Sequence, residues 1–170
     1  MFLDIHDLQR QKREFQEHLL PGRIHFGEEV KQVEPLDVLG SAELLQADIR
    51  LRGRLRTVVE AECARCLEPI RSPVELEFDL FYRPMQTIAR EEDVEIKPAE
   101  LDVGFYQGSG LLLEDALKEQ ILLALPMKSL CRADCAGLCP QCGHDRNLGL
   151  CSCRPADGDI RWAPLAEFHK

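Results

Sequence analysis

The stretch that decides the fold runs from Ile49 to Leu80 and reads IRLRGRLRTVVEAECARCLEPIRSPVELEFDL. Apolar and charged residues alternate over residues 49–56 and again over residues 74–80, which is the period-two pattern of strands with one buried face. The loop between them holds the pair Cys63 and Cys66. The simplest arrangement is an antiparallel pair of strands whose connection carries two thiols.

One helix is expected before this pair of strands in the sequence and one after it. Residues 3–20 carry a thin apolar stripe and end at Pro21-Gly22, while residues 111–125 place apolar side chains on one face and end before Pro126. We therefore predict an α+β fold, with an antiparallel sheet, an N-terminal helix, and a second helix before a zinc-ribbon-like tail. The expected division is a core domain over residues 1–130 and a Cys-rich tail over residues 131–170 that packs on it.

Composition narrows the classes of function. The chain has 170 residues, 45% of them hydrophobic, which is enough to build one core. Its formal net charge of −9 argues against a protein that binds mainly to the phosphate backbone of nucleic acid. The best apolar run, Ile121–Leu125, is far shorter than a membrane span, and the acidic N-terminus is unlike a secretory signal. We expect a cytoplasmic protein that does not insert into membranes.

The eight cysteines are the strongest chemical signal, because in a reducing compartment clustered thiols favour metal binding over disulfides. The turn Cys139-Pro-Gln-Cys142-Gly143 brings two thiolates to one side, and Cys151 and Cys153 follow within reach. These four predict one structural zinc site. The remaining thiols predict a second: Cys63, Cys66, Cys131 and Cys135.

The cysteine pattern admits other interpretations. His144 could replace one ligand, and buried cysteines can act as small hydrophobic side chains. The spacing Cys135-x3-Cys139-x2-Cys142 also matches a radical-generating iron–sulfur motif, but such enzymes need a large barrel that this chain lacks the length to build. Sites with four thiolates are closed to substrate, and no catalytic pattern accompanies them. We therefore expect a protein that is not an enzyme and has no small-molecule substrate.

Several motifs carry a resemblance to a known family. They read Cys63-Ala-Arg-Cys66-Leu67, then Leu123-Ala-Leu-Pro-Met-Lys128, then Cys131-x3-Cys135-Ala-Gly-Leu-Cys139-Pro-x-Cys142-Gly143, with Asn147, Cys151-x-Cys153 and residues 159–165 fitting as well. In these the chain resembles the YceD family, the bacterial and plastid large ribosomal RNA subunit accumulation proteins. The resemblance implies a non-enzymatic role in large ribosomal subunit assembly, with large-subunit ribosomal RNA or a ribosomal protein as partner.

A row of basic residues offers a candidate RNA contact: Arg50, Arg52, Arg54 and Arg56. Side chains two apart share one face of a strand, so the row could follow an RNA backbone. The acidic row Glu75, Glu77 and Asp79 could instead neutralise it from a neighbouring strand. The alternative function is accordingly a zinc-ribbon adaptor that binds another protein, for example a basic ribosomal protein, without contacting RNA.

Overall fold

Two long strands form the centre of the sheet. In the computed structural model, which describes residues 1–85 and 103–153, β5 (Asp48–Glu62) pairs antiparallel with β6 (Pro69–Pro84) along nearly its whole length. The register runs from Ile49 opposite Tyr82 to Glu62 opposite Pro69. The hairpin predicted from the alternating sequence is confirmed, and its connecting loop carries Cys63 and Cys66.

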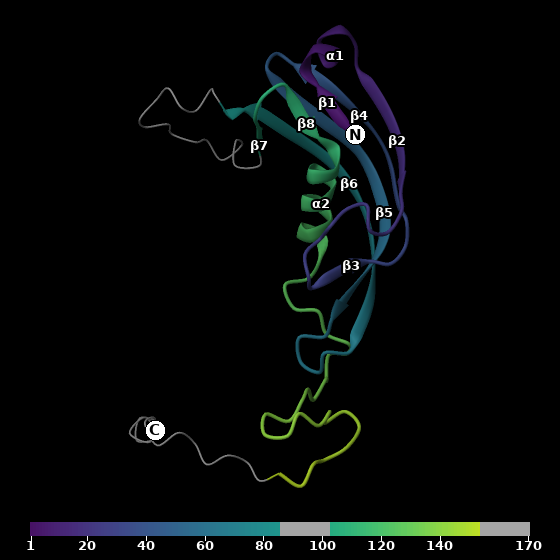
Figure 1. The fold of residues 1–170 in the computed structure, drawn as a ribbon, viewed down its shortest axis with the longest axis vertical. Helices are drawn as coiled ribbons and strands as arrows, with labels where there is room; N and C mark the ends of the chain where they lie inside the picture. Colours follow the sequence, from purple (N-terminus) through teal and green to yellow (C-terminus); the bar gives the residue numbers. More distant parts are fainter. Residues whose placement is uncertain (86–102, 154–170) are drawn as a thin grey trace, which may run out of the picture.

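The other strands extend this hairpin into a curved sheet with the order β2-β4-β5-β6-β7 (Figure 1). β3 pairs with the second half of β5, beyond the part that β4 covers. The predicted antiparallel sheet is confirmed except at its edge, where β7 runs parallel to β6. A parallel neighbour needs a connection of about a dozen residues or more, and the chain between β6 and β7 is long enough. The bounds are β2 Arg13–Leu19, β3 Val30–Gln32, β4 Leu36–Leu45 and β7 Val103–Tyr106.

The helix expected over residues 3–20 is wrong in most of its length. It is divided into β1 (Phe2–Asp4), the short helix α1 (Ile5–Arg10) and β2. Phe15 and Leu19 are buried four residues apart, a spacing that fits a helical face and a strand face equally well. Because β2 finds a partner in β4, the extended conformation prevails there.

A second helix covers the concave side of the sheet. α2 (Leu113–Ala124) follows β8 (Gly110–Leu112), which pairs with β1, and it packs against β6 (Figure 1). Leu113, Leu117 and Ile121 are almost fully buried in the core. The helix predicted over residues 111–125 is therefore confirmed over residues 113–124, whereas residues 111–112 belong to β8. Within the described residues, neither helix is long and apolar enough to cross a membrane.

Two glycines allow the aromatic side chains of the core to lie close against the sheet. The register places Phe15, Gly40, Gly53 and Phe78 in one row across four strands. Both rings are buried, and each lies where the neighbouring glycine has no side chain. A Cβ at position 53 would lie 2.4 Å from the Leu39 carbonyl oxygen and 2.9 Å from Cζ of Phe78.

The described part of the segment after α2, residues 125–153, has no sheet or helix of its own. Within residues 125–153 the one element of regular pairing is an isolated bridge between Leu138 and Asp145. This segment lies beyond the loop that joins β5 to β6, at the opposite end of the sheet from α1 (Figure 1). The cysteines that connect it to the core lie at this junction.

We predict that Gly53→Ala lowers the free energy of unfolding by about 1–3 kcal/mol, because the added methyl meets backbone atoms that cannot move aside. Gln16→Ala, on an exposed position of β2, serves as the control and should change stability little. Denaturant unfolding of both variants measures the difference. An unchanged midpoint for Gly53→Ala would show that the ring of Phe78 does not depend on this glycine.

Candidate metal centre

The loop between β5 and β6 is a turn built to present two sulfur atoms. The Leu67 N–H donates to the Cys63 carbonyl oxygen at 3.0 Å, which closes the turn over Cys63 and Cys66. The backbone N–H groups of Arg65 and Cys66 point toward Cys63 Sγ. Leu67 has a φ of 63°, the left-handed conformation that ends this kind of turn.

The segment after α2 supplies two more thiols at the same place. Cys63 Sγ lies 3.8 Å from Cys135 Sγ, and Cys66 Sγ lies 3.6 Å from Cys131 Sγ. The four sulfur atoms lie within 4.8 Å of one another. A regular tetrahedron with metal–sulfur bonds of about 2.3 Å has sulfur atoms about 3.8 Å apart, whereas a disulfide bond is about 2.05 Å. The spacing fits a shared metal ion and does not fit disulfides.

A second turn repeats the geometry of the first. The Gly143 N–H donates to the Cys139 carbonyl oxygen at 2.9 Å, and Gly143 has a φ of 72°. The N–H groups of Gln141 and Cys142 point toward Cys139 Sγ. Glycine tolerates this conformation without strain, so the sequence after Cys142 suits the turn better than the sequence after Cys66 does.

The remaining cysteines complete a second group of four: Cys139, Cys142, Cys151 and Cys153, whose sulfur atoms also lie within 4.8 Å of one another. The structure thus brings the eight cysteines together in the two sets expected from their spacing. His144 is exposed and lies outside both groups, although its carbonyl oxygen accepts a hydrogen bond from the Cys139 N–H at 2.8 Å.

The electrostatics of each group favours a cation at its centre. The N–H of Cys131, 3.4 Å from Cys63 Sγ, lowers the pKa of Cys63 to about 6, and the N–H groups of Cys142 and Gln141 lower the pKa of Cys139 to about 6. Burial raises the pKa of Cys131 to about 12, and the Cys142 sulfur raises that of Cys153 to about 12. Each group therefore combines thiols whose pKa values are shifted in opposite directions. A divalent cation would remove this conflict by attracting all four as thiolates.

Asn147 connects the two groups. It lies in the loop between Cys142 and Cys151, yet its Nδ2 donates to Cys135 Sγ at 3.4 Å in the first group. Its Oδ1 accepts from the Ala136 N–H at 2.8 Å and from Arg132 Nη2 at 2.7 Å. In the sequence, Asn147 stands out only as part of the family motif. Its hydrogen bond to Cys135 could not be predicted, because residue spacing does not show that this loop contacts the other cysteine group.

Arg50, from the predicted arginine row, is already engaged by protein groups. Its Nε and Nη2 donate to the two carboxylate oxygens of Asp79 at 2.8 and 2.7 Å, and its guanidinium lies 5.3 Å from the centre of the Phe81 ring. This pairing raises the pKa of Arg50 and lowers that of Asp79. Binding of Arg50 to an RNA phosphate would have to compete with these contacts.

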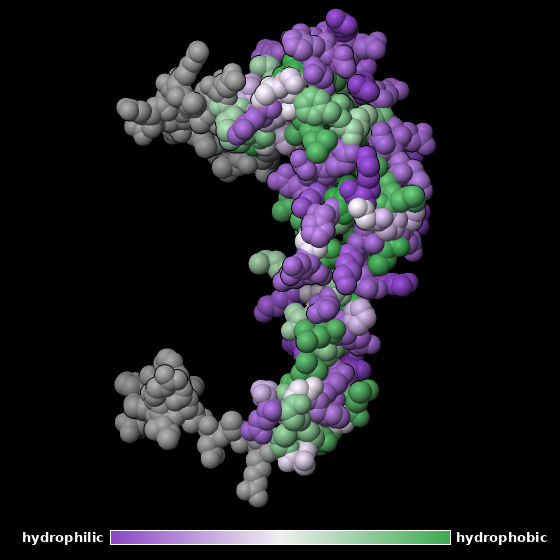
Figure 2. All heavy atoms as spheres, viewed as in Figure 1, coloured by the Kyte–Doolittle hydropathy of each residue, from purple (hydrophilic) through white to green (hydrophobic). Residues whose placement is uncertain are grey.

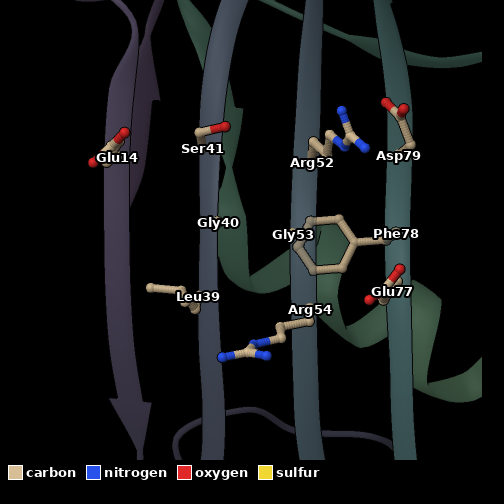
Figure 3. A pocket seen from close by; sticks show the side chains of 10 residues that line it. All are labelled: Glu14, Leu39, Gly40, Ser41, Arg52, Gly53, Arg54, Glu77, Phe78 and Asp79. Carbon is tan, nitrogen blue, oxygen red and sulfur yellow. The ribbon is translucent and has the colours of Figure 1, made fainter.

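The other three arginines lie on the open face of the sheet, opposite the acidic row. The pairs in register are Arg52 with Asp79, Arg54 with Glu77, and Arg56 with Glu75. Figure 3 shows Arg52 pointing toward Asp79, while Arg54 extends over β4 beside Leu39 and away from Glu77. A hollow of about 570 Å³ lies among these side chains. Contact between the arginine row and RNA stays a prediction. An RNA phosphate would meet the carboxylates that lie opposite these arginines on β6.

Comparison with known proteins decides the family. The family model described as large ribosomal RNA subunit accumulation protein YceD matches residues 51–169, a span that contains both cysteine groups. This chain belongs to the YceD family. The resemblance carried by the cysteine motifs is therefore confirmed.

Individual relatives within and beyond bacteria resemble this YceD-family chain. Proteins of Mycobacterium tuberculosis and Mycobacterium bovis are 35% identical over 137 residues, which cover 78% of this chain and 61% of each relative. The Arabidopsis thaliana protein named large ribosomal RNA subunit accumulation protein YCED homolog 1, chloroplastic, is 25% identical over 151 residues, or 72% of this chain and 44% of that protein. The chain thus spans less than two thirds of these relatives. No solved structure matches it.

We predict that the purified protein binds two zinc ions, and that Cys63→Ser removes one and Cys142→Ser removes the other, because each substitution breaks one group of four thiols. Native mass spectrometry counts the ions in each variant. Ser152→Ala, which lies between two ligands without being one, is the control and should keep both ions. Loss of both ions from each single variant would contradict the division into two independent groups.

We further predict that Asn147→Ala keeps both ions but releases the ion of the first group about ten-fold faster to a chelator. Hydrogen bonds to the ligand atoms of a metal site commonly change metal affinity by about 10–100-fold, and Asn147 donates such a bond to Cys135 Sγ. Release is followed with a colorimetric zinc indicator, with His144→Ala as the control from the same loop. In a Cys63→Ser background, which keeps only the second group, Asn147→Ala should have no effect. Equal release rates with and without Asn147 would contradict its role.

Proposed function

We propose that this protein is a zinc-binding, non-catalytic protein of the cytoplasm that supports assembly of the large ribosomal subunit and accumulation of its RNA. The observation that carries the proposal is the family match over residues 51–169, together with the position of the first cysteine group inside it. That group joins the β5–β6 loop to the segment after α2, so the residues that define the family form one connected unit.

Zinc is the ion that suits these residues best. Tetrahedral sites made only of thiolates hold zinc or iron, and closed four-ligand zinc sites stabilise structure and leave no position for a reacting water. The ligands would be the two sets Cys63, Cys66, Cys131 and Cys135, and Cys139, Cys142, Cys151 and Cys153. When bound, the ions would supply folding free energy to a segment that has little core of its own.

The electrostatics of the chain support a basic partner. A net charge of −9 favours encounter with positively charged proteins and disfavours tracts of phosphate. The acidic row opposite Arg52, Arg54 and Arg56 favours the second candidate function, a zinc-ribbon adaptor that binds a basic ribosomal protein without contacting RNA. Direct RNA contact through the arginine row is the competing form of the same assembly role.

Depletion of the protein should lower large-subunit ribosomal RNA relative to the small-subunit species and leave free small subunits on sucrose gradients. Wild-type protein should restore the ratio, and the double variant Cys131→Ser/Cys135→Ser should not, because the segment after α2 loses its connection to the sheet. Unchanged subunit ratios after depletion would remove the assembly role.

The variant Arg52→Gln/Arg54→Gln distinguishes an adaptor that binds a ribosomal protein from a protein that contacts ribosomal RNA directly. Rescue by this variant is expected and supports the adaptor, since the arginines would then only balance neighbouring acids. Failure of a folded Arg52→Gln/Arg54→Gln variant, with weaker and less salt-dependent binding to ribosomal RNA, would support direct contact.

A further inference from the structure

The last turn of α2 presents apolar side chains to solvent. Leu113, Leu117 and Ile121 point into the core, but Leu123 is 72% exposed and Met127, just after the helix, is fully exposed. Apolar side chains of this size are usually covered in a soluble protein when they cluster. Figure 2 shows hydrophobic residues gathered at the narrow part of the molecule, between α2 and the Cys-rich end.

These side chains line a groove of about 660 Å³. One wall is the end of α2 with Leu122, Leu123 and Met127, and the facing wall is formed by residues 28–30 and the end of β5 with the loop at Leu67. The groove therefore lies directly beside the first cysteine group, since Cys63 also lines it. Its walls come from segments far apart in sequence that this group holds together.

The charge around the groove is negative. Glu28, Glu29 and Glu62 line it, and Lys128 is the one basic residue among the described residues that do so. None of the three carboxylates forms an ion pair with any of the residues described in the structure. The apolar surface is thus bordered by acids that are free to attract a cationic partner.

Leu67 gives a second, independent indication that this surface is used. Its φ of 63° places a leucine in the left-handed region, where the matching turn of the second group has Gly143. A bulky residue in this conformation costs roughly 1 kcal/mol. Its side chain is 56% exposed, so burial in the core does not offset that cost. Leu67 instead lines the groove.

We propose that this groove binds a basic segment of a protein partner, with apolar side chains of that segment resting on Leu67, Leu123 and Met127 and its lysines or arginines facing Glu28, Glu29 and Glu62. This proposal names the kind of partner for the proposed function, and only the ribosomal origin of that partner rests on the proposed function. The surface and the chemistry of the segment follow from the groove itself.

Other occupants fit less well. RNA would bring phosphates against three carboxylates, which repel them. A small ligand needs a pocket that encloses most of its surface, and the strong exposure of Leu123 and Met127 gives no such enclosure. A peptide segment with both apolar and basic side chains satisfies the two features of the groove together.

The first test uses the zinc-loaded full chain and a labelled peptide of leucines and lysines at helical spacing, about four turns long. Binding is measured by fluorescence anisotropy, and the same peptide with glutamates in place of lysines should not bind. Leu123→Glu or Met127→Glu should weaken binding at least about ten-fold, while Leu45→Glu, at an exposed leucine that ends β4, should leave it unchanged. Equal binding by Leu123→Glu and wild type would overturn the proposal.

The variant Leu67→Gly separates recognition from folding. Glycine relieves the left-handed conformation, so thermal stability should stay the same or rise, while peptide binding should weaken several-fold. The triple variant Glu28→Gln/Glu29→Gln/Glu62→Gln should weaken binding at low salt and flatten its salt dependence. Loss of stability in Leu67→Gly with unchanged peptide binding would contradict a role in docking.

The second test identifies the natural occupant by cross-linking. The photoreactive residue p-benzoylphenylalanine replaces Leu123 in the zinc-loaded chain, which is mixed with RNA-free proteins of the large subunit or with protein-free ribosomal RNA. An adduct with a basic protein that is lost in the triple glutamine variant is expected. Adducts only with RNA, with a second copy, or with residues 154–170 of the same chain would each overturn the proposal.

The two proposals can fail separately. Peptide binding that depends on Leu123, combined with unchanged subunit ratios after depletion, would keep the groove and remove the ribosomal role. Loss of large-subunit RNA on depletion, combined with peptide binding that ignores Leu123 and the glutamates, would keep the role and remove the groove.

Discussion

The structure depends on the meeting of four sulfur atoms from two distant parts of the chain. Cys63 and Cys66 lie in the loop of the central hairpin, and Cys131 and Cys135 follow α2 by several residues. Around them the Arg65 side chain donates to the Cys135 carbonyl oxygen, and the Ala64 N–H donates to that of Ser129. The thiols and these hydrogen bonds together hold the end of the sheet, the end of α2 and the second cysteine group in one place.

This arrangement explains why the molecule has two kinds of stabilisation. The curved sheet and α2 share a continuous apolar core, in which Leu51, Leu55 and Ile121 are almost fully buried. The described residues 131–153 contribute few large apolar side chains to a core, and Leu148 and Leu150 are exposed. Burial of apolar surface contributes little to holding this part of the chain, and coordination of a metal ion by the cysteines would supply the missing constraint. Asn147 extends that constraint from one cysteine group to the other.

The sequence was informative where a pattern had one structural meaning. Alternation over residues 49–56 and 74–80 identified the central hairpin, and the spacing of the cysteines identified both groups of four. It was ambiguous at residues 13–19, where Phe15 and Leu19 satisfy a helix and a strand alike, and the pairing with β4 decided the outcome. The parallel β7 and the contact from Asn147 to Cys135 depend on tertiary placement, which local patterns do not carry.

We propose that each group of four thiols binds one zinc ion with no other ligand. X-ray absorption spectroscopy at the zinc edge of the purified full chain tests this most directly, because it reports the identity and distance of the atoms bound to the metal. A single shell of four sulfur atoms at about 2.3 Å is expected. A shell that includes nitrogen or oxygen, or a protein that carries no zinc and has its cysteines in disulfides, would contradict it.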